Sequence, residues 1–318
     1  MRKINFQKKS KLRFYFLSFL RLLVPRKFYI YKRGRLINNI DKSGLSYLNS
    51  RVDYYLKHNT PFVLPSDSVV LKDYKLKGKS AYFYDLKYVL NYFPLSMKFR
   101  YLFGDITTVE PTATIVKSRP ITNNNSNSVI MKLDTVRHFN FINDNVSFSD
   151  KKNMAVWRGK VFEEAQPHRK VFFNEVFSLE NCDIGKTNQN GENTHWEKAP
   201  MSIVEQLKFK YIICVEGNDV ATSLKWVMSS NSLCFMCKPK FETWFMEGTL
   251  LPNHHYVELK EDYSDLSEKI DYYNTHPEEA QKIINNANDY VKQFQNSKQE
   301  LLISLLVLQK YFKLSYQN

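Results

Sequence analysis

The carboxyl-terminal half of the chain alternates short apolar runs with amphipathic segments. Four apolar runs have the length and composition of buried strands, and they cover residues 154–159, 209–215, 233–236 and 255–259. The segments predicted to be helices cover residues 202–208, 220–229, 265–274 and 277–294. Strands that alternate with helices at this spacing predict an α/β fold with a doubly wound parallel sheet.

The amino-terminal half has a less regular pattern. Residues 99–105 form a strand-like run that ends in Gly104-Asp105, and residues 129–133 are predicted to be another strand. The polar segments 123–128 and 187–195 are predicted loops, because Asn, Ser and Gly dominate them. We place a domain boundary near residue 150, just before the strand at 154–159.

Length and composition agree with two folded domains. The chain has 318 residues, of which 43% are hydrophobic, so it can bury a substantial core. Only nine glycines and eleven prolines are present, which excludes fibrous and low-complexity proteins.

The positive charge of the chain is concentrated at its amino terminus. The net charge is +14, and residues 1–35 contain twelve Lys or Arg and no Asp or Glu. The remainder holds 34 basic and 32 acidic residues, so the body is nearly neutral. A protein that binds nucleic acid along its surface is expected to spread its positive charge over the folded domains, so we expect no nucleic-acid partner.

Residues 1–35 also contain an apolar run, 14–24, that Arg21 interrupts. The run is about half the roughly 20 residues that span a bilayer, and no small-residue cleavage site follows it. A basic, aromatic-rich helix of this kind fits the surface of an anionic membrane. The alternative is an ordinary first helix of the fold with a solvated basic face.

The four cysteines include one pair, Cys234 and Cys237, with the CxxC spacing of zinc and redox sites. No second pair of Cys or His lies at a suitable spacing to complete a zinc site. The surrounding residues 231–236 have the pattern of a buried strand, in which cysteine is a small apolar residue. So few cysteines favour a reducing compartment.

The segment 214–226 carries the strongest candidate binding site. A buried strand runs into the turn 216–219, and the predicted helix that follows has Thr222 and Ser223 in its first turn. Backbone amides at a helix start, two hydroxyl groups and Lys225 would suit a diphosphate. Glu216 could accept hydrogen bonds from ribose hydroxyls. The alternative is a structural helix with Asp219 as its N-cap.

Three further residues are candidates outside that segment. Arg158 and Arg169 could bind phosphate in a bidentate manner, although either could equally form a surface ion pair. Asp105 is the best candidate for a general base that takes a proton from a sugar hydroxyl, and the alternative is a turn-forming aspartate. The chain has no Asp-x-Asp motif for holding a metal on a nucleotide sugar, so we expect no metal and no other cofactor.

Taken together, these motifs resemble glycosyltransferase family 90, and most closely its bacterial LpsA-like branch. The family also includes Rumi-type protein O-glucosyltransferases and fungal capsule-associated proteins. The resemblance covers roughly residues 95–295. Its motifs are Gly104-Asp105, Arg137-His138-Phe139, Trp157-Arg158-Gly159 with Arg169, Asp183-Ile184-Gly185, the run 216–226, and 238–244.

The resemblance implies a GT-B architecture, with two Rossmann-like domains that face a cleft, and inverting, metal-independent transfer from a UDP-sugar. Matching positions make Asp105 the catalytic base and assign the diphosphate to Arg158, Thr222, Ser223 and Lys225. Lys225 departs from the arginine of the eukaryotic members, and Arg169 replaces a second arginine that they carry after the Trp-Arg-Gly motif. The full set of predicted donor-binding residues is Arg158, Arg169, Glu216, Gly217, Asn218, Asp219, Val220, Ala221, Thr222, Ser223 and Lys225.

The predicted domains are a basic amphipathic membrane-surface arm at 1–35, an acceptor-side domain at 36–150, a donor domain at 151–295 and a C-terminal helix at 296–318 that packs on the first domain. The expected activity is transfer of a hexose, with glucose preferred, to a lipopolysaccharide or lipooligosaccharide core. Protein or capsule acceptors are an alternative, as is a non-enzymatic basic membrane-binding protein. The chain ends without an ER-retention signal. Together with the basic arm, this leads us to expect a peripheral protein on the cytoplasmic face of a bacterial inner membrane.

Overall fold

The computed structural model describes residues 10–189 and 193–317. The predictions for residues 1–9, which include four basic residues of the arm, and for part of the loop 187–195 therefore lie outside the described residues. The chain divides into two compact units, each built from separate segments. Within the described residues, unit 1 comprises 139–240 and 247–293, and unit 2 comprises 10–138, 241–246 and 294–317.

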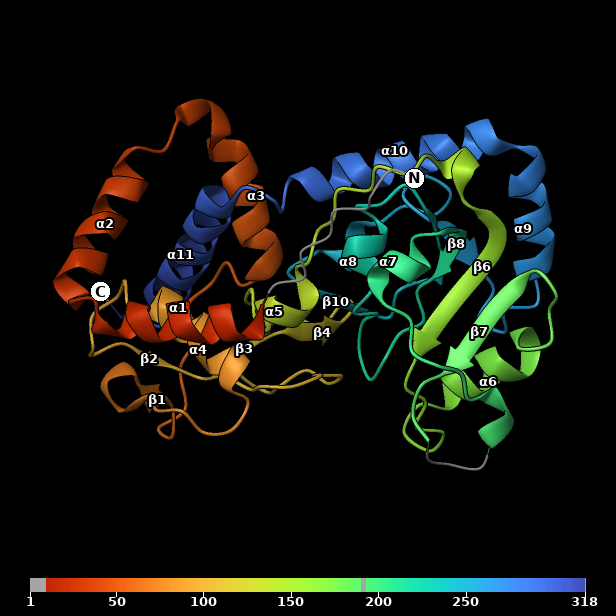
Figure 1. Cartoon of the computed structure of the whole chain (residues 1–318). Coiled ribbons are helices and arrows are strands. Elements are labelled where there is room, and N and C mark those ends of the chain that lie inside the picture. Colours follow the sequence, from red (N-terminus) through yellow and green to blue (C-terminus); the bar gives the residue numbers. More distant parts are fainter. Residues whose placement is uncertain (1–9, 190–192, 318) are drawn as a thin grey trace. The chain divides into compact units, whose positions relative to one another are not determined.

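Unit 1 contains a five-stranded sheet whose strands are all parallel, in the order β11-β9-β8-β6-β7. Figure 1 labels three of them, β8, β6 and β7. Its strands are β6 (Lys152–Gly159), β7 (Cys182–Lys186), β8 (Phe209–Ile213), β9 (Leu233–Cys237) and β11 (Val257–Leu259). Every residue of β8 is buried, as expected for a parallel sheet that is covered on both faces.

The helices of unit 1 connect and cover these strands. They are α6 (Pro167–Val176), α7 (Ile203–Gln206), α8 (Leu224–Val227), α9 (Leu266–Thr275) and α10 (Pro277–Lys292), with 3-10 turns at Phe148–Asp150, Thr194–Trp196 and Glu247–Thr249. Local sequence sets several of their starts. Proline occupies the first turn of both α6 and α10, where its missing N–H costs nothing, and Ser202 and Glu205 form a capping box at α7.

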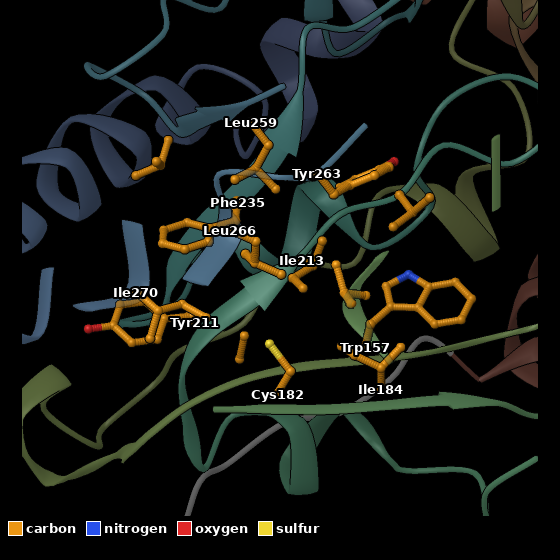
Figure 2. Packing of buried hydrophobic residues seen from close by; sticks show 14 of the residues in the cluster. Trp157, Cys182, Ile184, Tyr211, Ile213, Phe235, Leu259, Tyr263, Leu266 and Ile270 are labelled. Carbon is orange, nitrogen blue, oxygen red and sulfur yellow. The ribbon is translucent and has the colours of Figure 1, made fainter. Parts of the chain in front are cut away.

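One hydrophobic cluster of unit 1 lies on one face of the sheet, where alternate strand residues meet α6, α9 and α10. Figure 2 shows Trp157 of β6 and Ile184 of β7 on one side of this cluster, Ile213 of β8 next to Leu266 of α9, and Ile270 of α9 next to Tyr211 of β8 on the other side. Alternation with a period of two places these side chains on a common face. The cluster fixes the strands whose carboxyl ends carry the predicted donor residues.

The α/β class and the parallel sheet predicted from the sequence are confirmed. Strand β7 and helix α6 were not predicted, because Cys182–Lys186 lacks a long apolar run and α6 begins within a polar segment. The prediction of a helix over 220–229 is wrong at its start, since α8 begins only at Leu224.

Unit 2 is mainly helical, and its described strands form three two-stranded pairs (Figure 1). The pairs are β1 (Val69–Val70) with β2 (Lys98–Phe99), β3 (Thr114–Val116) with β5 (Ser128–Ile130), and β4 (Ser118–Pro120) with β10 (Phe241–Thr243). Only β3 and β5 run parallel. The described residues of unit 2 therefore hold no extended parallel sheet of the Rossmann type.

The helices of unit 2 include the last one in the chain. They are α1 (Lys11–Leu23), α2 (Arg26–Asn38), α3 (Leu45–Tyr55), α4 (Ser80–Leu90), α5 (Thr135–His138) and α11 (Ser297–Leu314), with 3-10 turns at Lys42–Gly44 and Leu71–Asp73. Helix α11 contacts α2, α3 and α4. Two buried ion pairs attach the distant segments of this unit: Arg51 pairs with Glu300 at 3.0 Å, and Arg119 pairs with Glu242 at 2.7 Å.

The described part of the basic arm, residues 10–35, folds into α1 and most of α2 and packs on α4. Tyr29 is buried against Tyr92, and the Arg26 guanidinium donates to the carbonyl of Leu90 at 2.8 Å. Several apolar side chains of α1 are nevertheless exposed: Leu12, Phe16, Phe19, Leu20 and Leu23. Among the described helices, none combines the length and the apolar character that crossing a membrane requires.

The prediction of one strand over 99–105 is wrong, because β2 ends at Phe99 and only Tyr101 forms a further bridge, to Ile115. The aromatic side chains of this run pack on one another instead: Tyr101 lies 5.7 Å from Phe99 and 4.6 Å from Phe103, measured between ring centroids. Asp105 therefore follows an irregular segment and not a strand.

Candidate functional site

The connections of the unit 1 sheet create a topological switch point between β6 and β8. The chain leaves β6 for β7 on one side and then enters β8 on the other side of β6. In open α/β sheets, ligands bind outside the carboxyl ends of the strands at such a point. The segments at this position are the residues after Gly159 and the residues after Ile213, which include Glu216.

Arg169, in the first turn of α6, joins these two segments. Its Nε donates to the carbonyl oxygen of Glu216 over 2.9 Å, and its Nη1 donates to the carbonyl oxygen of Lys160. The guanidinium lies 5.4 Å from the Trp157 ring centroid. Burial lowers the pKa of Arg169 to about 10, so the group remains protonated at neutral pH. Arg169 thus holds a positive charge at the switch point.

Two neighbours of Arg169 contact the same segment after β8. The Nε2 atom of His168 lies 2.9 Å from the carbonyl oxygen of Glu216, and Gln166 donates to the Oδ1 of Asn218 over 3.0 Å. Burial lowers the pKa of His168, and the nearby positive charge of Arg169 lowers it further, against the opposing hydrogen bond to Glu216. His168 therefore favours its neutral form here. Neither residue was predicted to take part in the site.

The segment 214–223 is a loop of turns and bends and not the start of a long helix. Thr222 and Ser223 precede α8, and the four-residue helix is too short to supply the anion site that was predicted at its amino terminus. Asp219 is not the N-cap of α8, because Ser223 occupies that position. The loop itself, rather than a helix dipole, presents the polar groups.

The residues of this loop differ in how far they reach solvent. Val220, Ala221 and Asp219 are buried, Glu216, Gly217 and Ser223 are half-buried, and Asn218 and Thr222 are exposed. The Glu216 carboxylate accepts a hydrogen bond from the backbone N–H of Lys240 over 3.0 Å, which ties the loop to the residues after β9. Gly217 lies next to Arg169, since a Cβ atom on Gly217 would lie 3.6 Å from a guanidinium nitrogen of Arg169.

Lys225 is buried and pairs with the equally buried Glu247 in unit 1. Taking two such charges out of water carries a desolvation cost that only close pairing offsets. The position of the Lys225 ammonium is therefore set by Glu247, a residue that sequence reasoning missed because it lies 22 positions later.

Arg158 points toward the β7 side of β6 and makes a local network there. Its Nη2 donates to the carboxylate of Asp183 over 2.7 Å, and Lys198 donates to the same oxygen over 3.0 Å. Burial alone raises the pKa of Asp183, but the hydrogen bonds and charges of Arg158 and Lys198 outweigh it and lower that pKa. Gly185 permits this packing, since a Cβ there would lie 2.5 Å from the Cβ of Lys198.

Asp105, the predicted base, lies in unit 2 beside a buried ammonium group. The Lys117 Nζ donates to Asp105 Oδ1 over 2.6 Å, and the side chain of Lys117 is 3% exposed whereas that of Asp105 is 32% exposed. Gly104 has φ +136°, a conformation that side chains other than hydrogen rarely allow. The backbone bend at Gly104 and the bond from Lys117 together fix the carboxylate while one side of it meets solvent.

A second carboxylate, Asp134, belongs to the same group of charges. Burial raises the pKa of Asp134, while the charges of Arg137 and Lys117 lower it and that of Asp105 raises it. Asp134 also forms an ion pair with Arg137 at 3.1 Å, and Arg137 is the first residue of the Arg-His-Phe motif that contributes to the family resemblance. Sequence reasoning missed Lys117 and Asp134, because neither lies in a motif and only folding brings them near Asp105.

The structure thus places the predicted residues in three groups. Arg169, Glu216, Gly217 and Asn218 meet at the switch point, Arg158 lies with Asp183, and Lys225 lies with Glu247. Asp105 belongs to unit 2. Over 10–189 and 193–317, no group of three or more His, Cys, Asp or Glu side chains has the arrangement of a metal site.

Comparison with known proteins identifies the family. The sequence model of glycosyl transferase family 90 matches residues 128–318. The O-glucosyltransferase LpsA of Dichelobacter nodosus is 43% identical over 267 residues, which cover 84% of this chain and 83% of that protein. Protein O-glucosyltransferase 3 of Homo sapiens is 30% identical over 146 residues, which cover 44% of this chain and 28% of that protein.

A further relative, protein O-glucosyltransferase 2 of Danio rerio, is 35% identical over 83 residues, or 26% of this chain and 16% of that protein. The animal relatives are therefore matched over a small part of their length, whereas the bacterial one is matched over most of it. The family match covers more than half of the chain and agrees with the bacterial relative. The chain belongs to glycosyl transferase family 90 and is a glycosyltransferase.

Proposed function

We propose that this protein is an O-glucosyltransferase that moves glucose from a UDP-sugar to a hydroxyl of a lipopolysaccharide or lipooligosaccharide core. The similarity to LpsA of Dichelobacter nodosus, which is named an O-glucosyltransferase, supports glucose as the sugar. The non-enzymatic alternative is wrong, since the chain belongs to a family of transferases. A protein or a capsule polysaccharide as the acceptor is the remaining alternative. Of these two, the animal relatives named as protein O-glucosyltransferases favour a protein acceptor.

The observation that supports a nucleotide-sugar donor is the position of Arg169 at the switch point of the unit 1 sheet. A half-buried, protonated guanidinium that joins the loops after β6 and β8 offers a positive charge where α/β sheets bind phosphate-containing ligands. The hydroxyls of Thr222 and Ser223 lie in the same loop as Glu216. In this proposal they donate to the diphosphate, and Glu216 accepts from the ribose.

The proposed reaction is a single displacement that inverts the anomeric carbon without a metal. The acceptor oxygen forms a bond to that carbon, its proton passes to the Asp105 carboxylate, and the bond between the carbon and the UDP oxygen breaks. The leaving UDP carries the negative charge, which cationic groups stabilise. The ammonium of Lys117, 2.6 Å from Asp105, favours the ionised carboxylate that a base requires.

A GT-B arrangement remains part of this proposal, with the donor domain at 151–295 and the acceptor-side domain at 36–150. The parallel sheet of unit 1 supports the first Rossmann-like domain. The described strands of unit 2 form two-stranded pairs, and this differs from the extended parallel sheet of a second Rossmann-like domain.

We also propose that residues 1–35 place the enzyme on an anionic membrane, at the cytoplasmic face of a bacterial inner membrane. The exposed apolar side chains of α1, among them Phe16 and Phe19, together with the basic residues of the arm support this. The double variant Phe16→Ser, Phe19→Ser is expected to reduce sedimentation with anionic vesicles several-fold, because it removes two exposed apolar side chains. The substitutions should not disturb folding, since both positions are exposed. Unchanged sedimentation would contradict the membrane role.

The experiment that tests the main proposal is a donor screen. The full chain is heated with each of several UDP-sugars and with GDP- and ADP-sugars, and a bound donor raises the unfolding temperature by mass action. We expect a rise with UDP-glucose, and product analysis of the transferred sugar by NMR then gives the anomeric configuration. A rise with other nucleotides alone, or retention of configuration, would overturn the proposal, and turnover that chelator abolishes would overturn its metal independence.

A further inference from the structure

Unit 2 contains a cavity of about 630 Å³ that the proposed reaction does not use. It lies where α11 contacts α2 and α3, and its volume falls within the roughly 300–1,000 Å³ typical of small-molecule sites. Its wall is largely apolar. It includes Leu36 at the end of α2, Ile40 just after that helix, Leu48 of α3 and Leu302 of α11.

The charged residues that line this cavity are mainly cationic. Lys32 and Arg35 come from α2 and Lys298 comes from the start of α11, against one acidic residue, Asp41. The Asp41 carboxylate accepts a hydrogen bond from the Ser43 hydroxyl over 2.6 Å. Within the described chain the three cationic side chains form no ion pair. An apolar wall with three positive charges and one negative charge carries a net positive charge, and this matches an amphiphile with an anionic head.

Two aromatic side chains of α2 line the cavity and also reach the exposed surface of that helix. Phe28 and Tyr31 of α2 line the cavity and are also 56% and 65% exposed. Phe28 follows α1 by only a few residues, and α1 exposes the apolar side chains described above. Phe28 and Tyr31 therefore offer apolar surface at the cavity to a ligand chain that enters from solvent or from a membrane.

We propose that this cavity binds one acyl chain of an anionic membrane lipid, with the phosphate of its head group beside Lys32, Arg35 and Lys298. The site holds the lipid to unit 2 and is separate from the residues assigned to sugar transfer. It does not depend on the identity of the donor or the acceptor.

The test uses the full chain and lysophosphatidic acid with a 12-carbon chain, below its micelle concentration, in a calorimetric titration. We expect saturable binding of one molecule per chain. Each methylene removed from the ligand should weaken binding roughly fourfold, as expected for burial of a CH2 group. Lysophosphatidylcholine of the same chain length should bind several-fold more weakly, because its head group has no net charge.

Two variants locate the site, and each is matched by a control. Arg35→Gln should weaken binding about fivefold, the usual effect of one cation beside an anionic lipid, whereas Lys27→Gln, on the same helix but outside the cavity, should not. Gly44 also lines the cavity, and a Cβ there would meet no atom within 4 Å, so Gly44→Phe is expected to fold and to reduce binding. Thermal unfolding of each variant checks the fold.

Four results would overturn the proposal: no saturable binding, many molecules bound per chain, equal affinity for the two head groups, or equal loss in Lys27→Gln. Loss of binding through concentration-dependent self-association would assign the cavity to a second copy of the chain and would also overturn it. A failure of the donor screen leaves this titration unaffected, because no sugar nucleotide is present in it.

Discussion

Arg169 and Glu216 are joined by a 2.9 Å hydrogen bond from the guanidinium Nε to the carbonyl oxygen, and this bond links the loops after β6 and β8. The bond lies at the switch point of the parallel sheet, where a ligand is expected. The same guanidinium contacts the Lys160 carbonyl and the Trp157 ring. One side chain therefore both shapes the proposed donor site and supplies its charge.

Arg169→Lys is expected to weaken donor binding, because an ammonium cannot make both backbone contacts with the same planar geometry. Loss of one charged hydrogen bond is worth about 2 kcal/mol, or roughly thirtyfold in the donor Kd. Titration of the UDP-sugar measures this. Lys170→Gln, the exposed neighbour on α6, is the control and should bind normally. A normal donor Kd in Arg169→Lys would remove Arg169 from the donor site.

Asp105→Asn is expected to lower kcat by about 10²–10⁴-fold, the usual contribution of a positioned base. The donor Kd should stay unchanged, because Asp105 belongs to unit 2 and the predicted donor residues belong to unit 1. Steady-state kinetics and donor titration measure the two quantities. Asp67→Asn, which removes an exposed partner of Arg100 in the same unit, is the control. Normal turnover in Asp105→Asn would exclude the base role.

Lys117→Met is expected to move the acid limb of the kcat/KM pH profile to higher pH. The nearby ammonium favours the ionised Asp105, so its removal requires a higher pH to ionise the base. Lys117→Arg keeps the positive charge and should restore the profile in part. A profile of unchanged shape with only a lower plateau would mean that Lys117 supports the fold and does not position the base.

Lys225→Met is expected to cost about 3–5 kcal/mol of unfolding free energy, because it leaves the buried Glu247 carboxylate without its cation. The double variant with Glu247→Leu should recover much of that loss, as apolar replacements of buried pairs often do. Denaturant unfolding measures both. If the double variant binds donor normally, Lys225 does not hold the diphosphate, and a double variant as unstable as the single one would contradict the pairing argument.

His168→Gln is expected to flatten the pH dependence of stability on the acid side. The folded pKa of His168 lies below its ordinary 6.5, mainly because of burial, so the unfolded state binds more protons below that pH. The contribution of His168 to stability is present above pH 6.5 and is lost as the pH falls through its folded pKa. Unfolding free energies at pH 7.5 and 5 measure the difference. An equal decrease in both proteins would show that His168 does not titrate in this way.

The family and the sheet were accessible to sequence reasoning for identifiable reasons. The strands β6, β8 and β9 each contain a short run of mainly apolar residues, and a run buried on both faces leaves that pattern regardless of its surroundings. The Trp-Arg-Gly motif and the run 216–226 carry the family resemblance, because their spacing along the chain is itself the signal. Strand β7 and helix α6 were not predicted, because their local patterns are weak.

The sequence by itself determined the α/β class, the parallel sheet of unit 1 and membership of a transferase family, since these follow from periodicity and motif order. Only the tertiary structure decided which groups meet. It placed Lys117 against Asp105, Glu247 against Lys225 and Asp183 against Arg158. Each pair joins residues 12 to 25 positions apart in the chain. No local pattern encodes such a pair, because its partners are selected by packing and by the need to compensate each buried or half-buried charge.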